Sequence, residues 1–196
     1  PPEDHDINGN TRMRSAGKAV PGTEIQIRGP DNKELPRGEI GEVCVRSPSN
    51  TAGYWKLPDA TKDTIDGDGW LHTGDAASMD EDGYVYVTGR SKELIIRGGF
   101  NIYPPEVEAA INDHPAVVQS AVIGRRTDTG DEEVLAFVQI PAPDTITADE
   151  LRAFVETRLS AYKRPSQIVL TQTLPAAPTG KLLKHRLLDT FADQLS

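Results

Sequence analysis

The sequence predicts an α+β protein in two parts, a β-rich part at residues 1–91 and a compact α/β part at residues 92–196. In the first part, short segments of alternating polarity are separated by Gly and Pro, a spacing typical of a small barrel or part of one. In the second part, apolar strand-like segments alternate with amphipathic helical segments, which indicates helices packed on a three-stranded sheet. No long linker separates the two parts, so we expect a short hinge near Ser91.

The first part contains three segments that we expect to be strands. They lie at residues 23–28, 39–46 and 84–88, and alternation is clearest in the first of them. Residues 29–32 (GPDN) supply turn chemistry after the first strand, and residues 81–83 (EDG) form a tight turn before the last.

The second part begins with a short strand at residues 92–97, which the Gly98-Gly99 pair turns. Three apolar strands follow at residues 116–123, 134–140 and 166–171, and these are the strands of the expected sheet.

Three helices are expected in the second part. Pro104 and Pro105 suit the first turn of a helix, where a missing N–H costs no hydrogen bond. Thr147 and Glu150 have the spacing of a capping box ahead of an apolar stripe. A last helix is expected over about residues 183–192.

Composition limits the possible classes of function. The formal net charge of −9 argues against nucleic acid as a general partner, and no apolar run is long enough to span a bilayer. Cys44 is the single cysteine, which indicates a reducing, cytoplasmic setting. The cysteine and the four histidines show no metal-ligand spacing, so no metal site is predicted. The polar start at Pro1 carries no signal-peptide pattern, and we interpret the chain as part of a longer one.

Polar residues at Gly-rich turns form the first group of candidate site residues. Asp75 follows Thr73-Gly74 and is expected to begin a strand, and Arg90 follows Gly89. A carboxylate of this kind can hold a ribose diol, and a guanidinium can hold a phosphate or hydroxyl. Equally, an Asp can cap a turn and an Arg can pair with a surface acid, and the Gly98-Gly99 pair can admit a thin ligand or merely turn a hairpin.

Lys181 is the second kind of candidate, because Gly180-Lys181 suggests a phosphate loop. A Walker loop requires Gly five positions before Gly180 and Ser or Thr after the lysine, whereas this chain has Pro175 and Leu182. The loop can still present Lys181 to charge that develops on phosphate oxygens, or Lys181 can be an ordinary surface lysine.

Together these motifs resemble the adenylate-forming family of acyl-CoA synthetases, luciferases and peptide-synthetase adenylation domains. The resemblance runs from about Arg14 to Leu188. It rests on six motifs in the family's order: AGKAVPGTEIQI, GEIGEVCVRSPSNTAGYW, GWLHTGD, DGYVYVTGRSKELIIRGGFNIYPPEVE, LSAYKRP and PAAPTGKLLKHRL. It implies that residues 1–91 are the end of a large N-terminal domain and residues 92–196 a mobile small C-terminal domain.

The resemblance also implies a role for each candidate. Asp75 would bind the ribose hydroxyls of ATP and of the acyl-adenylate, with Arg90 assisting. Lys92 would be the hinge, and Lys181 the catalytic lysine of adenylation. The channel for the pantetheine arm of CoA would be lined by Gly98, Gly99, Phe100 and Asn101. The implied reaction joins a carboxylic acid to AMP from ATP, and the CoA thiolate then displaces AMP.

Two family motifs are not found in this sequence, namely the Ser/Thr/Gly-rich loop for the ATP phosphates and the segment that holds adenine and magnesium. We expect both upstream of Pro1, in the missing part of the large domain, together with the ligands of Mg²⁺. The chain by itself is therefore not expected to form acyl-adenylate. GGFNIYPPEVE is most similar to fatty-acyl, medium-chain and malonyl-type CoA ligases, which favours a fatty or other hydrophobic acid. The alternatives are a peptide-synthetase adenylation domain and a non-catalytic small domain that binds CoA or a partner protein.

Overall fold

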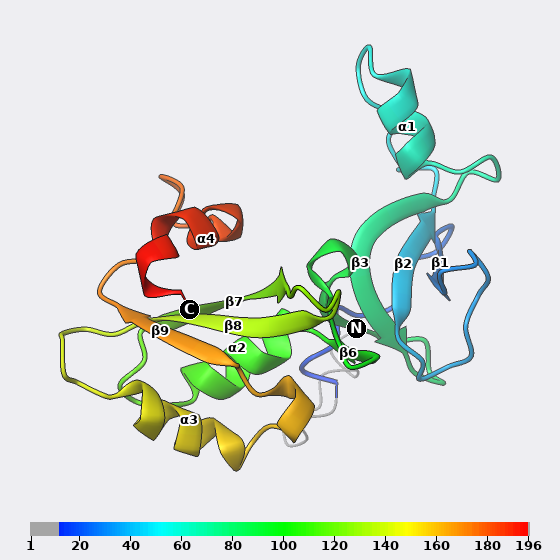
Figure 1. Cartoon of the computed structure of the whole chain (residues 1–196). Coiled ribbons are helices and arrows are strands. Elements are labelled where there is room, and N and C mark those ends of the chain that lie inside the picture. The colour runs from blue at the N-terminus through cyan, green and yellow to red at the C-terminus, as the bar shows by residue number, and fades with distance from the viewer. Residues whose placement is uncertain (1–11, 196) are drawn as a thin grey trace. The chain divides into compact units, whose positions relative to one another are not determined.

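The computed structural model describes residues 12–195, and the chain divides into two compact units, Pro1–Lys92 and Glu93–Ser196 (Figure 1). Each unit has its own apolar core. The predicted α+β class is confirmed, and the strands form several small sheets. Among the described residues, no helix has the length and hydropathy that crossing a membrane requires.

The first unit is built on an antiparallel sheet of four strands in the order β1-β2-β3-β4. The strands are β1 (Glu24–Arg28), β2 (Gly41–Arg46), β3 (Leu71–Met79) and β4 (Val85–Arg90). One face of this sheet carries a core of Ile27, Val43, Ala77, Met79 and Val85. The three strands predicted for this part of the sequence are confirmed as β1, β2 and β4, with small shifts at their ends.

The sequence predicts a turn at residues 73–75 and a strand that begins at Asp75, whereas strand β3 begins at Leu71 and runs through these residues. Gly74 does adopt a positive φ of 73°, but the strand continues through it as a bulge. Opposite Val43, the register changes from Glu42 paired with Ala76 to Cys44 paired with His72, so β3 has extra residues there. Likewise Gly89-Arg90 lies within β4 and is not a turn.

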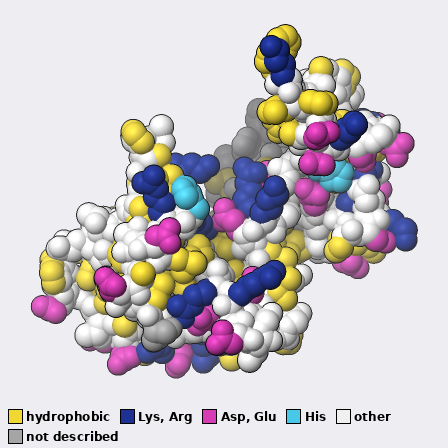
Figure 2. All heavy atoms as spheres, turned by 45° about the horizontal axis from the view of Figure 1, so that its top comes forward, with side chains coloured by type: hydrophobic (Ala, Val, Ile, Leu, Met, Phe, Trp, Pro, Cys, Tyr) yellow, Lys and Arg dark blue, Asp and Glu magenta, His cyan; other side chains and the backbone are white. Residues whose placement is uncertain are grey.

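A short helix, α1 (Pro58–Thr64), lies between β2 and β3 and was not predicted. Pro58 occupies its first turn, as proline commonly does. The segment before it exposes large apolar side chains, Trp55 most of all, and apolar side chains gather over this region in Figure 2.

The second unit is built on a three-stranded sheet with helices on both faces. Strand β8 (Glu132–Gln139) is central, antiparallel to β7 (Gln119–Arg126) and parallel to β9 (Gln167–Thr171). In Figure 1, α2 (Pro104–Asn112) and α3 (Ala148–Glu156) lie on the same side of this sheet.

Residues of β8 alternate between two cores. Val134, Ala136 and Val138 belong to the core that α2 and α3 cover. Leu135 and Phe137 belong to the opposite core, which the C-terminal segment covers. Since both faces are covered, β8 is apolar almost throughout, as its sequence VLAFV indicates.

The helix ends of the second unit agree with the sequence at α3 and differ at the C-terminus. The capping box between Thr147 and Glu150 is confirmed. The single helix expected over residues 183–192 is instead three short pieces: η4 (Lys184–Arg186), α4 (Leu187–Thr190) and η5 (Ala192–Gln194). These short helical segments are stabilised mainly by the burial of Leu187 and Phe191 against the sheet, and less by helix propensity.

Candidate functional site

Asp75 and Arg90 lie directly opposite each other on β3 and β4, in the first unit. Their Cα atoms are partners in the strand register, and Arg90 Nε lies 3.0 Å from Asp75 Oδ1. Both side chains are partly exposed, the arginine more than the carboxylate. The structure thus presents a partly exposed carboxylate and guanidinium side by side on two neighbouring strands of the sheet.

The bulge at residues 73–75 sets the orientation of Asp75. Thr73 Oγ1 donates a hydrogen bond to the Val43 carbonyl at 2.9 Å and accepts one from the Asp75 N–H at 3.1 Å. The Gly74 N–H donates to Glu42 Oε1 at 3.0 Å. The backbone before Asp75 is therefore fixed by neighbours on β2, which preorganises the carboxylate.

Lys181 is the last residue of a tight turn at residues 177–181 of the second unit, here called the lysine turn. The Gly180 N–H donates to the Ala177 carbonyl, and the Ala177 N–H donates to the Lys181 carbonyl, both at 2.8 Å. Gly180 has a φ of 84°, a left-handed conformation that glycine adopts without strain. The lysine side chain is exposed, so the turn displays its ammonium to solvent.

Lys184 holds the base of the lysine turn to the rest of the second unit. Its ammonium lies 2.8 Å from carboxylate oxygens of both Glu93 and Glu108. Burial lowers the pKa of Lys184, but the hydrogen bonds with Glu108 and Glu93 outweigh it, and the net result is a raised pKa. Glu108 also accepts the Val122 N–H at 2.8 Å, so the network joins α2, β7 and the chain after Leu183.

The Gly98-Gly99 pair forms the two-residue loop between β5 (Ile95–Arg97) and β6 (Phe100–Ile102). Both glycines have positive φ, 57° and 79°, as in the type I′ turns that suit hairpins. The Gly98 N–H donates to both carboxylate oxygens of Asp131, at 2.9 and 3.0 Å. A Cβ built on either glycine meets no atom within 4 Å, so the loop exposes bare backbone.

The neighbours of this loop also face solvent. Phe100 is half exposed and stacks on Tyr162 with ring centroids 4.5 Å apart, and Asn101 is exposed. Lys92 lies in η2 (Ser91–Glu93), not in the strand predicted at residues 92–97, and is the last residue of the first unit. The strand begins only at Ile95, which is buried.

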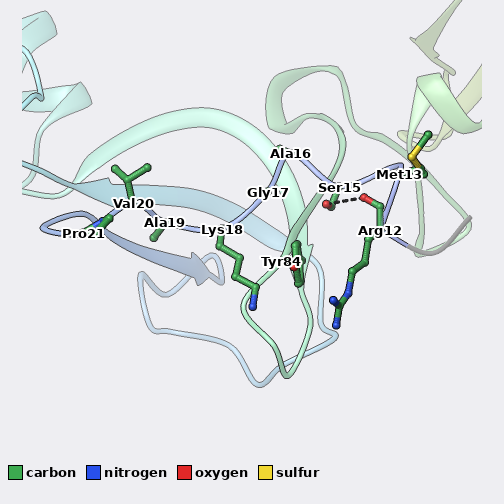
Figure 3. Close-up of a pocket in the computed structure, with 10 residues that line it drawn as sticks. All are labelled: Arg12, Met13, Ser15, Ala16, Gly17, Lys18, Ala19, Val20, Pro21 and Tyr84. Carbon is green, nitrogen blue, oxygen red and sulfur yellow. Dashed lines mark hydrogen bonds between the residues drawn. The ribbon is translucent and has the colours of Figure 1, made fainter. Parts of the chain in front are cut away.

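The first unit also contains a pocket with a volume of about 820 Å³, and it holds none of the candidates (Figure 3). Tyr84 and residues from the segment 12–21 line it. Lys18 Nζ lies 4.3 Å and the Arg12 guanidinium 4.7 Å from the centroid of the Tyr84 ring, so two cations stack on one aromatic ring.

Sequence reasoning did not single out Lys184, Asp131 or Glu42. Each acts through a partner distant in sequence, such as Glu93 for Lys184 or Gly74 for Glu42. Only the tertiary structure pairs them.

Comparison with known proteins gives two family matches in this chain. Residues 4–55 match the family described as AMP-binding enzyme, and residues 106–181 match the AMP-binding enzyme C-terminal domain. The chain is 37% identical over 191 residues to a fatty acid–[acyl-carrier-protein] ligase, ScoC, of Streptomyces coeruleorubidus, covering 97% of this chain and 36% of that protein. It is 41% identical over 185 residues to a long-chain-fatty-acid–CoA ligase of Salmonella typhimurium, covering 94% of this chain and 32% of that protein.

Solved structures agree with these matches. ATP-bound MatB from Rhodopseudomonas palustris superposes with a TM-score of 0.85 at 37% identity, over 96% of this chain and 38% of that one. The Bacillus subtilis o-succinylbenzoate CoA synthetase (MenE), in complex with its acyl-adenylate intermediate, gives 0.82 at 34% identity, over 90% and 36%. The fold and motifs are those of part of the adenylate-forming class of proteins. The chain belongs to the AMP-binding family that includes the acyl-CoA synthetases, and it spans about a third of the length of the curated relatives it matches.

Proposed function

We propose that this chain is part of an AMP-forming acid–thiol ligase that activates a carboxylic acid as an acyl-adenylate and transfers it to CoA. The observation that carries the proposal is the Asp75–Arg90 pair held across β3 and β4, within a chain whose relatives include CoA ligases. In this proposal the β-rich first unit is the barrel-like end of a large domain, and the second unit is the mobile small domain.

Asp75 and Arg90 would bind the ribose of the nucleotide. A carboxylate can accept hydrogen bonds from both hydroxyls of a ribose, and it does so at low entropic cost when its backbone is already fixed. Arg90 already pairs with one Asp75 oxygen, so it would keep the carboxylate oriented while the other oxygen meets the sugar.

Lys181 would act in the adenylation step only. An exposed ammonium on a tight turn can approach the carboxylate and the α-phosphate and neutralise the charge that develops as pyrophosphate leaves. In the thioesterification step, the bare Gly98-Gly99 loop with Phe100 and Asn101 would receive the pantetheine arm. A hinge at Lys92 would exchange the two faces of the small domain between the steps.

Magnesium is expected with ATP in such an enzyme, and the described residues do not offer it a fitting site. Among them, the one group of three close metal-ligand side chains is Glu42, Cys44 and His72. A thiol and an imidazole do not suit a cation that prefers oxygen ligands and water. The Mg²⁺ ligands are therefore expected outside this chain.

The acid substrate is proposed to be a fatty or other hydrophobic acid. Relatives named as fatty acid ligases support this, but a sulfoacetate–CoA ligase is also 38% identical, so similarity at this level does not select the acid.

The test uses the full-length parent enzyme and separates its two half-reactions. Lys181→Ala should lower acid-dependent pyrophosphate exchange by a hundredfold or more, on the order of the loss of one transition-state charge contact. Conversion of supplied acyl-AMP to acyl-CoA should remain near the wild-type rate. The matched control is Lys62→Ala, since Lys62 is an exposed lysine on α1. Equal loss of both half-reactions in Lys181→Ala would contradict the role of Lys181. Acid-dependent pyrophosphate exchange by the present chain alone would contradict the expectation that part of the active site lies outside this chain.

A further inference from the structure

Three potential metal ligands lie together on the first unit, away from Lys181 and the Gly98-Gly99 loop in sequence. Glu42 and Cys44 lie two positions apart on β2, and His72 is the cross-strand partner of Cys44 on β3. Side chains two apart on a strand point to one face, so Val43 between them enters the core while its neighbours meet His72. One carboxylate, one thiol and one imidazole therefore converge.

The two distances from His72 Nδ1 to its neighbours are close to those of a tetrahedral metal site. Cys44 Sγ lies 3.5 Å and Glu42 Oε2 2.9 Å from His72 Nδ1, and the three ligand atoms lie within 4.8 Å of one another. Zinc bonds of about 2.3 Å to sulfur and 2.0–2.1 Å to nitrogen, at tetrahedral angles, place S and N about 3.5 Å apart and N and O about 3.3 Å apart. Of these two distances, the sulfur–nitrogen distance already fits, and the nitrogen–oxygen distance must lengthen by a few tenths of an ångström.

Neighbouring groups orient Glu42 and His72 so that their potential metal-binding atoms face each other. Glu42 Oε1 is occupied by the Gly74 N–H, which turns Oε2 toward His72. On the other side of the ring, His72 Nε2 lies 3.7 Å from Asp66 Oδ2. A carboxylate behind the second ring nitrogen is the usual support of a metal-bound histidine, because it fixes the ring orientation and increases its basicity.

Asp66 is itself anchored. Its Oδ1 accepts the N–H groups of Asp68 and Trp70, and Arg28 pairs with its Oδ2 at 3.0 Å. These contacts fix the Asp66 carboxylate beside His72 Nε2.

We propose that Glu42, Cys44 and His72 form a binding site for a zinc-type divalent cation, with its fourth position open to water. Thiolate and imidazole ligands favour Zn²⁺ and its spectroscopic substitute Co²⁺ over Mg²⁺ or Ca²⁺. On binding, the thiol proton and any proton on Nδ1 pass to solvent, and the cation balances the two anionic ligands. Cys44 is fully buried while the Glu42 and His72 side chains are 28% and 22% exposed, so the cation enters from the side of those two residues.

The same contacts without a metal would be a hydrogen-bonded Glu–His pair beside a neutral thiol, so the experiment must separate the two arrangements. The present chain, freed of metal by chelator and dialysis, is titrated with Co²⁺ and then with Zn²⁺ in competition. The expected result is saturation at one equivalent, with a thiolate-to-cobalt charge-transfer band and the visible bands of tetrahedral Co²⁺, both removed by Zn²⁺.

Variants identify the ligands. Cys44→Ser should abolish the charge-transfer band, and His72→Gln and Glu42→Gln should each weaken binding at least about tenfold. His114→Gln is the matched control, because His114 is a part-buried histidine of the second unit. Folding of each variant is checked by the fluorescence of Trp55 and Trp70, which both belong to the first unit.

Absence of saturable Co²⁺ binding by the folded wild-type chain would overturn the proposal and leave the hydrogen-bonded pair. Binding that survives Cys44→Ser with an unchanged spectrum would also overturn it, since the cation would then lie on other groups. Neither outcome depends on the ligase activity of the parent enzyme.

Discussion

Lys184 provides the sharpest test of how the lysine turn is held, because one ammonium serves two carboxylates. Replacing it with methionine keeps the aliphatic stem and removes only the charge and the hydrogen bonds to Glu93 and Glu108. Glu108 retains its bond from the Val122 N–H but loses its counter-ion. The variant therefore leaves a largely buried carboxylate without a cation.

The expected cost follows from the burial of the three groups. Removing one partner of a fully buried ion pair costs about 3–5 kcal/mol. Here the Lys184 and Glu108 side chains are 23% and 17% exposed, while Glu93 is 43% exposed and can be hydrated. We therefore expect Lys184→Met to lower the free energy of unfolding of the second unit by about 2 kcal/mol.

The measurement must report on the second unit, and tryptophan fluorescence does not, because Trp55 and Trp70 are the only tryptophans and both belong to the first unit. Hydrogen exchange of peptides spanning β7 and β8, followed by mass spectrometry across a urea series, gives the stability of the sheet on which the network rests. Arg152→Met is the control, because the Arg152–Asp149 pair is exposed and should contribute less than about 0.5 kcal/mol.

The raised pKa of Lys184 fixes the pH dependence of this difference. A folded pKa above the unfolded value of about 10.4 means that the contribution is complete below that value and is lost as pH rises through the folded pKa. The gap between wild type and variant should stay constant from neutral pH to about pH 9 and shrink above 10. Two results would refute the idea that Lys184, Glu93 and Glu108 act together. One is a loss of unfolding free energy below about 0.5 kcal/mol in Lys184→Met, and the other is strict additivity of the losses in Lys184→Met and Glu108→Gln.

Two further substitutions test local features. Thr147→Ala removes the side-chain acceptor for the Glu150 N–H and should destabilise the second unit by about 1 kcal/mol in urea unfolding. The control is Thr157→Ala, near the other end of α3. An equal loss of stability in both variants would contradict the capping role of Thr147. Gly41→Ala should unfold the first unit or cost it several kcal/mol, because the new Cβ would lie 2.4 Å from the Arg28 carbonyl oxygen. In Gly98→Ala the new Cβ would meet no atom within 4 Å, so this variant should lose only about 1 kcal/mol of stability, because of the positive φ at that position. A smaller loss of stability in Gly41→Ala than in Gly98→Ala would contradict this explanation.

Much of the fold follows from local pattern. Strand β8 was predictable because five consecutive apolar residues serve two cores, and α3 because its capping box lies within four residues. The first part of strand β3 was not, because Thr73-Gly74-Asp75 has turn composition and its hydrogen bonds go to β2, some thirty residues earlier. The register of a neighbouring strand, not local propensity, extends the chain there.

The candidate site was likewise only partly predictable from the sequence. Asp75, Arg90 and Lys181 were recognisable as motif residues, but what each contacts was not. Lys184 meets Glu93 across ninety-one positions, and Cys44 meets His72 across twenty-eight. Neither spacing has a sequence signature, so a search for metal-ligand spacing passes over Cys44, and the cluster exists only through the register of β2 against β3.

One backbone irregularity connects the proposed nucleotide edge with the proposed metal site. The bulge at residues 73–75 orients Asp75 and, through the Gly74 N–H, holds the Glu42 carboxylate. Glu42→Gln would therefore disturb both sites, because it changes a metal ligand and the acceptor that anchors the bulge. Cys44→Ser changes only the ligand atom of a fully buried residue. In the parent enzyme, loss of Co²⁺ binding with unchanged nucleotide affinity is thus expected for Cys44→Ser, whereas a parallel loss of both would show that the bound cation itself supports the position of Asp75.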